Sequence, residues 1–168
     1  MGAVDYIARW LAPWQSLYDN SKLVSGSVTA VHLLALLYGG GLAIAADRST
    51  LRAARRSAPV REYLIDELGA IHRPVLVALT LVFLTGVLLT AADFKTFVVS
   101  PAFWVKMGLI TLLVINGAVL TRTEAAIRGR PSSATDERLW NRLQTNSRVS
   151  IALWMLTLVA GVVVTDAT

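Results

Sequence analysis

The 168-residue chain is 55% hydrophobic and only 16% charged, whereas soluble domains carry roughly 25% charged residues. It has no cysteine, which excludes disulfides, thiolate metal sites and covalently attached c-type haem. The net charge of +5 does not indicate nucleic-acid binding, because the basic residues gather in two blocks between apolar runs, as membrane topology requires. Four apolar runs fill about half of the chain, so we expect one integral membrane domain over residues 1–168.

The N-terminal segment, residues 1–20, combines aromatic and aliphatic side chains at helical spacing. Trp and Tyr prefer the headgroup region of a bilayer, so the segment is typical of a short interfacial helix. We expect this helix to be bent or restarted at Pro13. A helix packed against the end of the bundle fits the same pattern. There is no basic leader followed by a long apolar core, so we do not expect a cleaved signal peptide.

Four membrane-spanning helices are predicted, at residues 24–46, 72–92, 101–121 and 148–165. A hydrocarbon layer needs ~20 apolar helical residues to be crossed, and the first run has no Asp, Glu, Lys or Arg. We expect residues 47–71 to form a polar loop or short surface helix, and residues 121–148 a polar loop with a flexible turn at 129–133. Short connections predict antiparallel neighbours, so the fold class is an all-α, up-down four-helix bundle.

The arginines predict the orientation of this bundle. Residues 47–71 hold five arginines and residues 121–148 hold six, whereas the segments at the other end hold only Arg9, Lys22 and Lys95. Basic loops stay in the cytoplasm. We therefore expect a multi-pass protein of the inner (plasma) membrane with both termini outside, in the periplasm of a Gram-negative cell.

The chain has only two histidines, and both fall in or at predicted spans. An ionisable residue inside a membrane is costly and is by default a candidate functional residue. His32 lies ~12 Å from the outer end of the first span, and His72 lies ~18 Å farther along the membrane normal, at 1.5 Å per helical residue. One iron is therefore not expected to take both. Each histidine is a candidate haem or metal ligand. The alternatives are a buried hydrogen bond for His32 and an interfacial position for His72.

Other polar side chains are candidates for the same site. Met155 shares the predicted depth of His32 and is either a second haem ligand or a packing residue. Lys106 is expected to reach toward the headgroups, or else to pair with a haem propionate or an anionic substrate. Arg48 lies at the cytoplasmic rim and is a candidate carboxylate clamp. Asn116 is expected to form an interhelical hydrogen bond.

No other motif with catalytic spacing occurs. There is no phosphate-binding loop, no HExxH and no nucleophile with a base at motif spacing. Nearly all the carboxylates fall in the predicted loops.

The second and third spans resemble a known family. The sequences HRPVLVALTLVFLTGVLL and FWVKMGLITLLVINGAVLTR are similar to the copper-resistance D (CopD-like) membrane proteins. The likeness is carried by the pair Thr85-Gly86, the aromatic residue before Lys106, and the run from Asn116 to Arg122. It implies a copper-handling membrane protein, for which soft Met and His ligands are expected.

A related four-helix group is also similar. The HemJ-type protoporphyrinogen oxidases have a histidine on the first helix and a Trp-x-Lys at the third, which correspond to His32 and to Trp104 and Lys106 in this chain. Those oxidases bind haem b, so the resemblance implies a haem site that includes these residues. They also have an arginine one turn after the histidine, where this chain has Leu36. If the protein is an enzyme, the resemblance implies an oxidoreductase.

Taken together, these observations predict a small b-type haem protein with His32 as an axial ligand, acting in electron transfer or tetrapyrrole handling. One alternative is a copper-handling protein of the CopD-like type. Another is a non-catalytic bundle that packs against a larger membrane complex. The expected partners are the lipid bilayer and either a redox partner or other membrane-protein subunits.

Overall fold

The computed structural model describes residues 2–129 and 136–166. Within these residues the chain forms only helices and turns, with no strand, which confirms the predicted all-α class. The helices are α1 (Ala3–Asn20), α2 (Lys22–Ala53), α3 (Ala58–Ala92), α4 (Phe94–Val99), α5 (Pro101–Arg128) and α6 (Glu137–Asp166).

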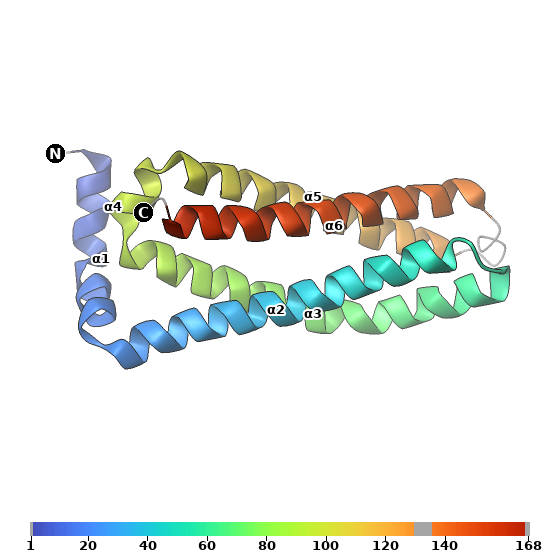
Figure 1. The fold of residues 1–168 in the computed structure, drawn as a ribbon, viewed down its shortest axis with the longest axis horizontal. Helices are drawn as coiled ribbons and strands as arrows, with labels where there is room; N and C mark the ends of the chain where they lie inside the picture. The colour runs from blue at the N-terminus through green and yellow to red at the C-terminus, as the bar shows by residue number, and fades with distance from the viewer. Residues whose placement is uncertain (1, 130–135, 167–168) are drawn as a thin grey trace.

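The four long helices form an antiparallel bundle of two hairpins. α2 packs along α3, α5 packs along α6, and the two pairs meet mainly where α2 contacts α6 (Figure 1). All four are long and apolar enough to cross a membrane. We call the end that carries the α2–α3 and α5–α6 connections the basic end. The short helices α1 and α4 lie at the opposite end (Figure 1).

The polar connections are much shorter than the sequence pattern predicts. α2 continues to Ala53 and α3 begins at Ala58, so most of residues 47–71 is helical rather than a loop. α5 likewise continues to Arg128, and α6 begins at Glu137. Continuations of the long helices replace the loop or short surface helix expected at residues 47–71 and much of the loop expected at residues 121–148. A change from apolar to polar residues does not end a helix, because Ala, Arg, Glu and Leu are all strong helix formers. Gly129 ends α5, and the rest of the expected turn lies outside the described residues.

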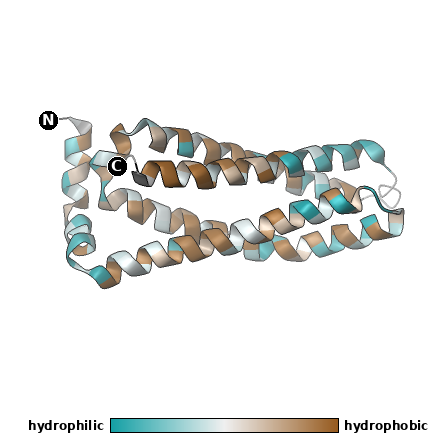
Figure 2. Ribbon diagram, in the orientation of Figure 1, coloured by the Kyte–Doolittle hydropathy of each residue, from teal (hydrophilic) through white to brown (hydrophobic). Residues whose placement is uncertain are grey.

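The densest hydrophobic core lies at the basic end. There the helices are rich in polar residues (Figure 2). Their few apolar side chains pack against one another in a buried cluster. Arg61 stacks over the ring of Trp140 at 5.2 Å and pairs with Glu137 at 2.8 Å. The core consists of Ala53, Ala54, Leu64, Ile65, Leu68, Ile127, Trp140 and Leu143.

The apolar stretches of the long helices are organised differently. Only 11–28% of the residues in the most apolar part of each are buried within the chain. Large apolar side chains such as Leu37, Phe83 and Val159 are more than half exposed. This is the pattern of helices that lipid surrounds, because hydrocarbon rather than a protein core covers their outer faces.

Helix α1 lies across the end of the bundle instead of joining it (Figure 1). The indole Nε1 of Trp14 donates to the carbonyl of Leu88 at 2.9 Å, and Gln15 Nε2 donates to the carbonyl of Ala91 at 3.2 Å. These bonds place α1 against the last turn of α3. Pro13 lies inside α1 and does not divide it, which corrects the expected restart there.

Candidate functional site

His32 of α2 is held against α3 by a hydrogen bond to Thr85, and the backbone of Val82 is a second hydrogen-bond partner. Its Nδ1 lies 2.8 Å from the hydroxyl of Thr85, and that hydroxyl is itself 2.6 Å from the carbonyl of Leu81. A hydroxyl has one proton, and the carbonyl of Leu81 can only accept, so Thr85 donates to Leu81 and accepts from His32. The imidazole therefore carries its proton on Nδ1.

Two more residues lie near this imidazole. Gly86 follows Thr85, and a Cβ atom at that position would lie 3.4 Å from Cε1 of His32. Lys106 of α5 is half-buried and turns toward α6, where its Nζ lies 3.6 Å from the place of a Cβ on Gly161. The charge of Lys106 is close enough to act on His32. His32 and Thr85 therefore form a first polar region between α2 and α3, with Lys106 as the charged residue that acts on it.

Small residues form a stripe along α2, and its centre is used for helix packing. The stripe consists of Ser25, Thr29, Ala35, Gly39, Ala43 and Ala46. A Cβ on Gly39 would lie 2.7 Å from Cβ of Ala78, and one on Gly40 would lie 3.2 Å from the ring of Trp154. α3 and α6 fill the space at these two positions, so no flat cofactor fits between the helices there. Gly26 and Gly41 have open space instead.

The other candidates predicted from the sequence lie on the surface of the bundle. Met155 is 48% exposed, Trp104 is 59% exposed, and Arg48 is exposed. The Nε1 of Trp104 donates to the carbonyl of Val98 at 2.9 Å, which ties α5 to α4.

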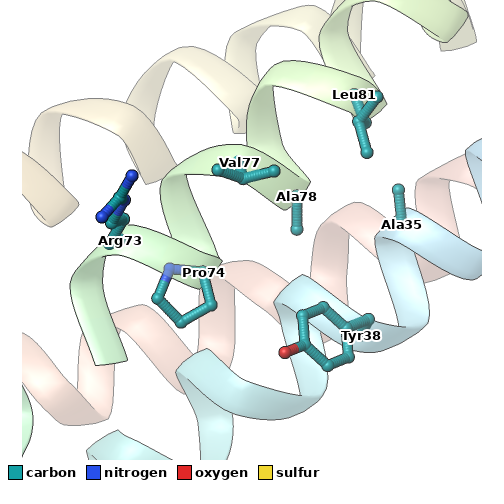
Figure 3. Close-up of a pocket in the computed structure, with 7 residues that line it drawn as sticks. All are labelled: Ala35, Tyr38, Arg73, Pro74, Val77, Ala78 and Leu81. Atoms are coloured by element: carbon teal, nitrogen blue, oxygen red, sulfur yellow. The ribbon is translucent and has the colours of Figure 1, made fainter. Parts of the chain in front are cut away.

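A groove of about 410 Å³ runs between α2 and α3 on the outside of the bundle. Ala35 and Tyr38 of α2 face α3 across it (Figure 3). The groove starts one helical turn from the His32–Thr85 contact, at Ala35 and Leu81, and ends at Arg73. Its lining is almost wholly apolar, as expected for a crevice filled by lipid chains.

A second polar region lies closer to the basic end, and the sequence analysis missed it. Asp47 of α2 is 4% exposed and Glu124 of α5 is 3% exposed, so two carboxylates are buried inside the bundle. Both residues lie in segments that the sequence analysis placed outside the spans, whereas the structure continues α2 and α5 through them. Asp47 faces the hydroxyls of Ser147 and Ser150 on α6. Ser147 is fully buried, and its hydroxyl makes no hydrogen bond of standard geometry.

His72 belongs to this second region. Its Nδ1 lies 2.6 Å from the carbonyl of Leu68, and its Nε2 lies 3.0 Å from Oε2 of Glu124. Both ring nitrogens therefore face protein atoms. His72 is thirteen positions before Thr85 on α3, or ~20 Å at 1.5 Å per residue, so the two histidines form two separate sites.

The sequence did contain a signal for the buried carboxylates. Asn116, which was expected to bond between helices, donates from Nδ2 to the carbonyl of Asn146 at 3.1 Å. Glu124 follows Asn116 by eight positions and so lies on the same face of α5. Asp47 follows Ala43 by four positions and continues the small-residue stripe of α2.

No family model, no curated protein and no solved structure matches the chain. The resemblance to CopD-like and HemJ-type proteins therefore stays a prediction.

The donor set limits which metal species the first region suits. In residues 2–129 and 136–166 no group of three or more His, Cys, Asp or Glu side chains is arranged to hold a metal ion. A bare ion at His32 would lack protein ligands of these types. A haem supplies four ring nitrogens of its own and needs only one or two axial ligands, so a single oriented imidazole fits it better.

Proposed function

We propose that this protein is a small membrane-embedded b-type haem protein in which His32 is an axial ligand. The observation that carries the proposal is the hydrogen bond from His32 Nδ1 to Thr85, which puts the proton of a neutral ring on Nδ1 and makes Nε2 the nitrogen with the lone pair. Histidines that bind metals commonly donate their other ring nitrogen in this way, because the bond fixes the tautomer and the direction of the ring.

Bound haem would supply one-electron iron chemistry, with a potential set by the axial ligand and by burial. The residues of this chain have simpler roles. Thr85 holds the imidazole, and Lys106 offers a positive charge to a carboxylate such as a propionate. The outward-facing apolar side chains keep the region in lipid and away from bulk water. Electron transfer or tetrapyrrole handling would both use this arrangement.

A non-catalytic role in a larger membrane complex is the second candidate. It is favoured by the direct packing of Gly39 on Ala78 and of Gly40 on Trp154, which uses the central small residues for helix contacts. In this alternative, the hydrogen bond to Thr85 serves only to give the N–H group of His32 an acceptor inside the bundle. Copper handling is less well supported, because a copper site would need several soft ligands and Met155 is on the surface.

The visible absorption spectrum of purified protein tests the proposal. We expect a Soret band in protein extracted in mild detergent, and we expect His32→Ala to abolish it. His72→Gln is the matched control and should retain the band, because His72 lies in a separate site. The chain has no third histidine, so the two variants together test every histidine. Retention of the band in His32→Ala would remove His32 as the ligand. A colourless protein that contains copper would support the copper alternative, and a colourless, metal-free protein would support the structural one.

We also propose that the basic end faces the cytoplasm of a bacterial cell, with the protein in the inner membrane and both termini outside. The proposal rests on the concentration of arginines at this end of the bundle.

A further inference from the structure

The contact between His72 and Glu124 lacks a proton if both side chains are in their usual states at neutral pH, a neutral imidazole and an ionised carboxylate. The Nδ1 of His72 faces a carbonyl oxygen at 2.6 Å, and a carbonyl can only accept, so Nδ1 always carries a proton. The other nitrogen, Nε2, lies 3.0 Å from Oε2 of Glu124. Oε2 is buried and makes no hydrogen bond of standard geometry within the described residues.

The contact is favourable only when one proton lies between Nε2 of His72 and Oε2 of Glu124. If His72 were neutral and Glu124 ionised, a lone pair and a negative oxygen would face each other at 3.0 Å. The carboxylate would then be a buried charge without a partner, which is strongly unfavourable in an apolar environment. A proton on Nε2 gives an ion pair, and a proton on the carboxyl gives a neutral acid next to a neutral base. Either state removes the conflict, and the two differ only in the position of the proton.

Other charged groups also act on Glu124. Asp47 of α2 adds a second negative charge near Glu124, and Arg128, one turn along α5, adds a positive one. Arg128 is already engaged, because it donates to the carbonyl of Ile65 at 2.7 Å and lies 3.9 Å from Asp66. From α6 the region receives hydroxyl groups, those of Ser147 and Ser150, which face Asp47.

His72 is the exposed member of the pair. The side chain of His72 is 32% exposed, whereas that of Glu124 is 4% exposed, so the imidazole lies between the buried carboxyl and the outside. Arg128 is 45% exposed and Asp66 is 74% exposed, so solvated charged groups begin one turn farther toward the basic end.

From this geometry we propose that His72 and Glu124 form a proton-binding site that exchanges one proton with water at the basic end of the bundle. His72 is the exposed member through which the proton enters and leaves. Glu124 is the buried member that shares it, and Asp47 is the second carboxylate that sets its electrostatic surroundings. The site is separate from the His32 region and does not depend on whether haem is bound there.

Nuclear magnetic resonance of ¹⁵N-labelled histidine tests the proposal in the full chain in lipid nanodiscs. With only two histidines, His32→Ala assigns the signals of His72. We expect the ¹⁵N chemical shift of His72 Nε2 to change in one step with pH, while Nδ1 stays protonated throughout. In Glu124→Gln the midpoint of that step should move by at least about one pH unit, as expected when a charge partner at ion-pair distance is removed.

Glu62→Gln is the matched control, because Glu62 is an exposed glutamate of the same end. It should leave the midpoint of His72 unchanged. An unchanged midpoint in Glu124→Gln would overturn the proposal. So would a midpoint that depends on sodium but not on an equal concentration of potassium, because the site would then bind a metal cation rather than a proton.

A measurement on the unaltered chain keeps the test valid if Glu124→Gln does not fold. Infrared difference spectra between acidic and basic pH should show a carboxyl band that changes at the same midpoint as the His72 signal, because one proton is shared by both groups. Two clearly different midpoints would show that the groups titrate independently, and the proposal would fail.

Discussion

At the scale of single residues, the hydrogen bond between His32 and Thr85 both links α2 to α3 and orients the imidazole. Thr85 donates within its own helix to Leu81 and still accepts from His32, so one hydroxyl satisfies a carbonyl of α3 and fixes the ring on α2. Thr85 is only 7% exposed, so no water replaces it readily.

Thr85→Val tests how much this bond contributes. Valine has nearly the same shape but cannot accept a hydrogen bond, so His32 Nδ1–H would be left unsatisfied inside the bundle. We expect a loss of about 1–3 kcal/mol in the free energy of unfolding. Thr80→Val is the matched control, because Thr80 is exposed on the same helix and bonds only to Leu76 of its own backbone. Reversible unfolding in mixed detergent micelles measures both, and equal losses would contradict the expected role of Thr85.

The residues of the two polar regions differ in how far sequence alone could identify them. His32 was found because a lone ionisable side chain inside an apolar run stands out. Thr85 was noted only as part of a resemblance, since threonines that bond to their own helix are common in spans. Asp47 and Glu124 were missed because each comes just after an apolar run, where polarity suggests a loop. Their burial depends on the helices continuing and packing, which periodicity within one span does not reveal.

At the scale of elements, the crossing of α2 and α3 depends on Gly39. Its missing Cβ lets the backbones approach, and Ala78 occupies the space on the other side. Small residues at such contacts are the usual means of close helix packing in membranes.

Gly39→Ala should therefore destabilise the bundle, by about 1–3 kcal/mol, because a Cβ would lie 2.7 Å from that of Ala78 and the helices would have to separate. Gly41→Ala is the matched control: nothing lies within 4 Å of its Cβ position, so the change should be neutral or slightly stabilising. The double variant Gly39→Ala with Ala78→Gly should recover most of the loss. Detergent unfolding curves measure all three, and equal effects of the two alanines would exclude a close contact at Gly39.

Helix α1 gives a pH-dependent prediction. A hydrogen bond from Lys95 at 2.9 Å, followed by one from the backbone of Gly2 and the charge of Lys95, holds the pKa of Asp5 below its ordinary value of 3.8. A group with a lowered pKa stabilises the folded arrangement above its ordinary pKa, and this stabilisation is lost as the pH falls through the lowered value. We expect α1 to loosen from α4 below about pH 4.

A nitroxide on Ala12→Cys measures this change, because the chain has no other cysteine and Ala12 is exposed. Its mobility should rise in acid. Lys95→Gln should already show raised mobility at neutral pH and little further change in acid. The same acid-induced rise in Lys95→Gln would mean that another group holds α1 in place.

At the scale of the whole molecule, two kinds of packing hold the four long helices. Near the basic end, a conventional core forms around Trp140 and Leu143, both fully buried. Across the apolar stretches most large side chains face outward. The sequence predicted the number of spans and the bundle, because a long apolar run is a strong signal. It did not predict the core at the basic end, because those apolar residues are few and lie among arginines.

Leu143→Ala should therefore cost about 2–5 kcal/mol, as for other buried leucines whose removal leaves a cavity. Leu112→Ala is the matched control on the lipid-facing surface, where Leu112 is 53% exposed. Its cost should be small, because lipid fills the space and no cavity remains. Unfolding curves of the two variants in the same micelles provide the comparison, and a large cost at Leu112 would show that this surface packs against protein.

The asymmetry of charge along the bundle leads to a last prediction, the orientation in the membrane. Single cysteines can be placed at either end without competing thiols, because the chain has none. Ser57→Cys lies at the basic end and Asp19→Cys at the opposite end, and both positions are exposed. In intact spheroplasts a membrane-impermeant maleimide should label Asp19→Cys and should label Ser57→Cys only after the membrane is opened. The reason is that the arginines of the basic end resist translocation, whereas the loss of one aspartate has little influence on topology. The opposite labelling pattern would place the His72–Glu124 pair and the arginines on the outer face, and the proton site would then open to the outside.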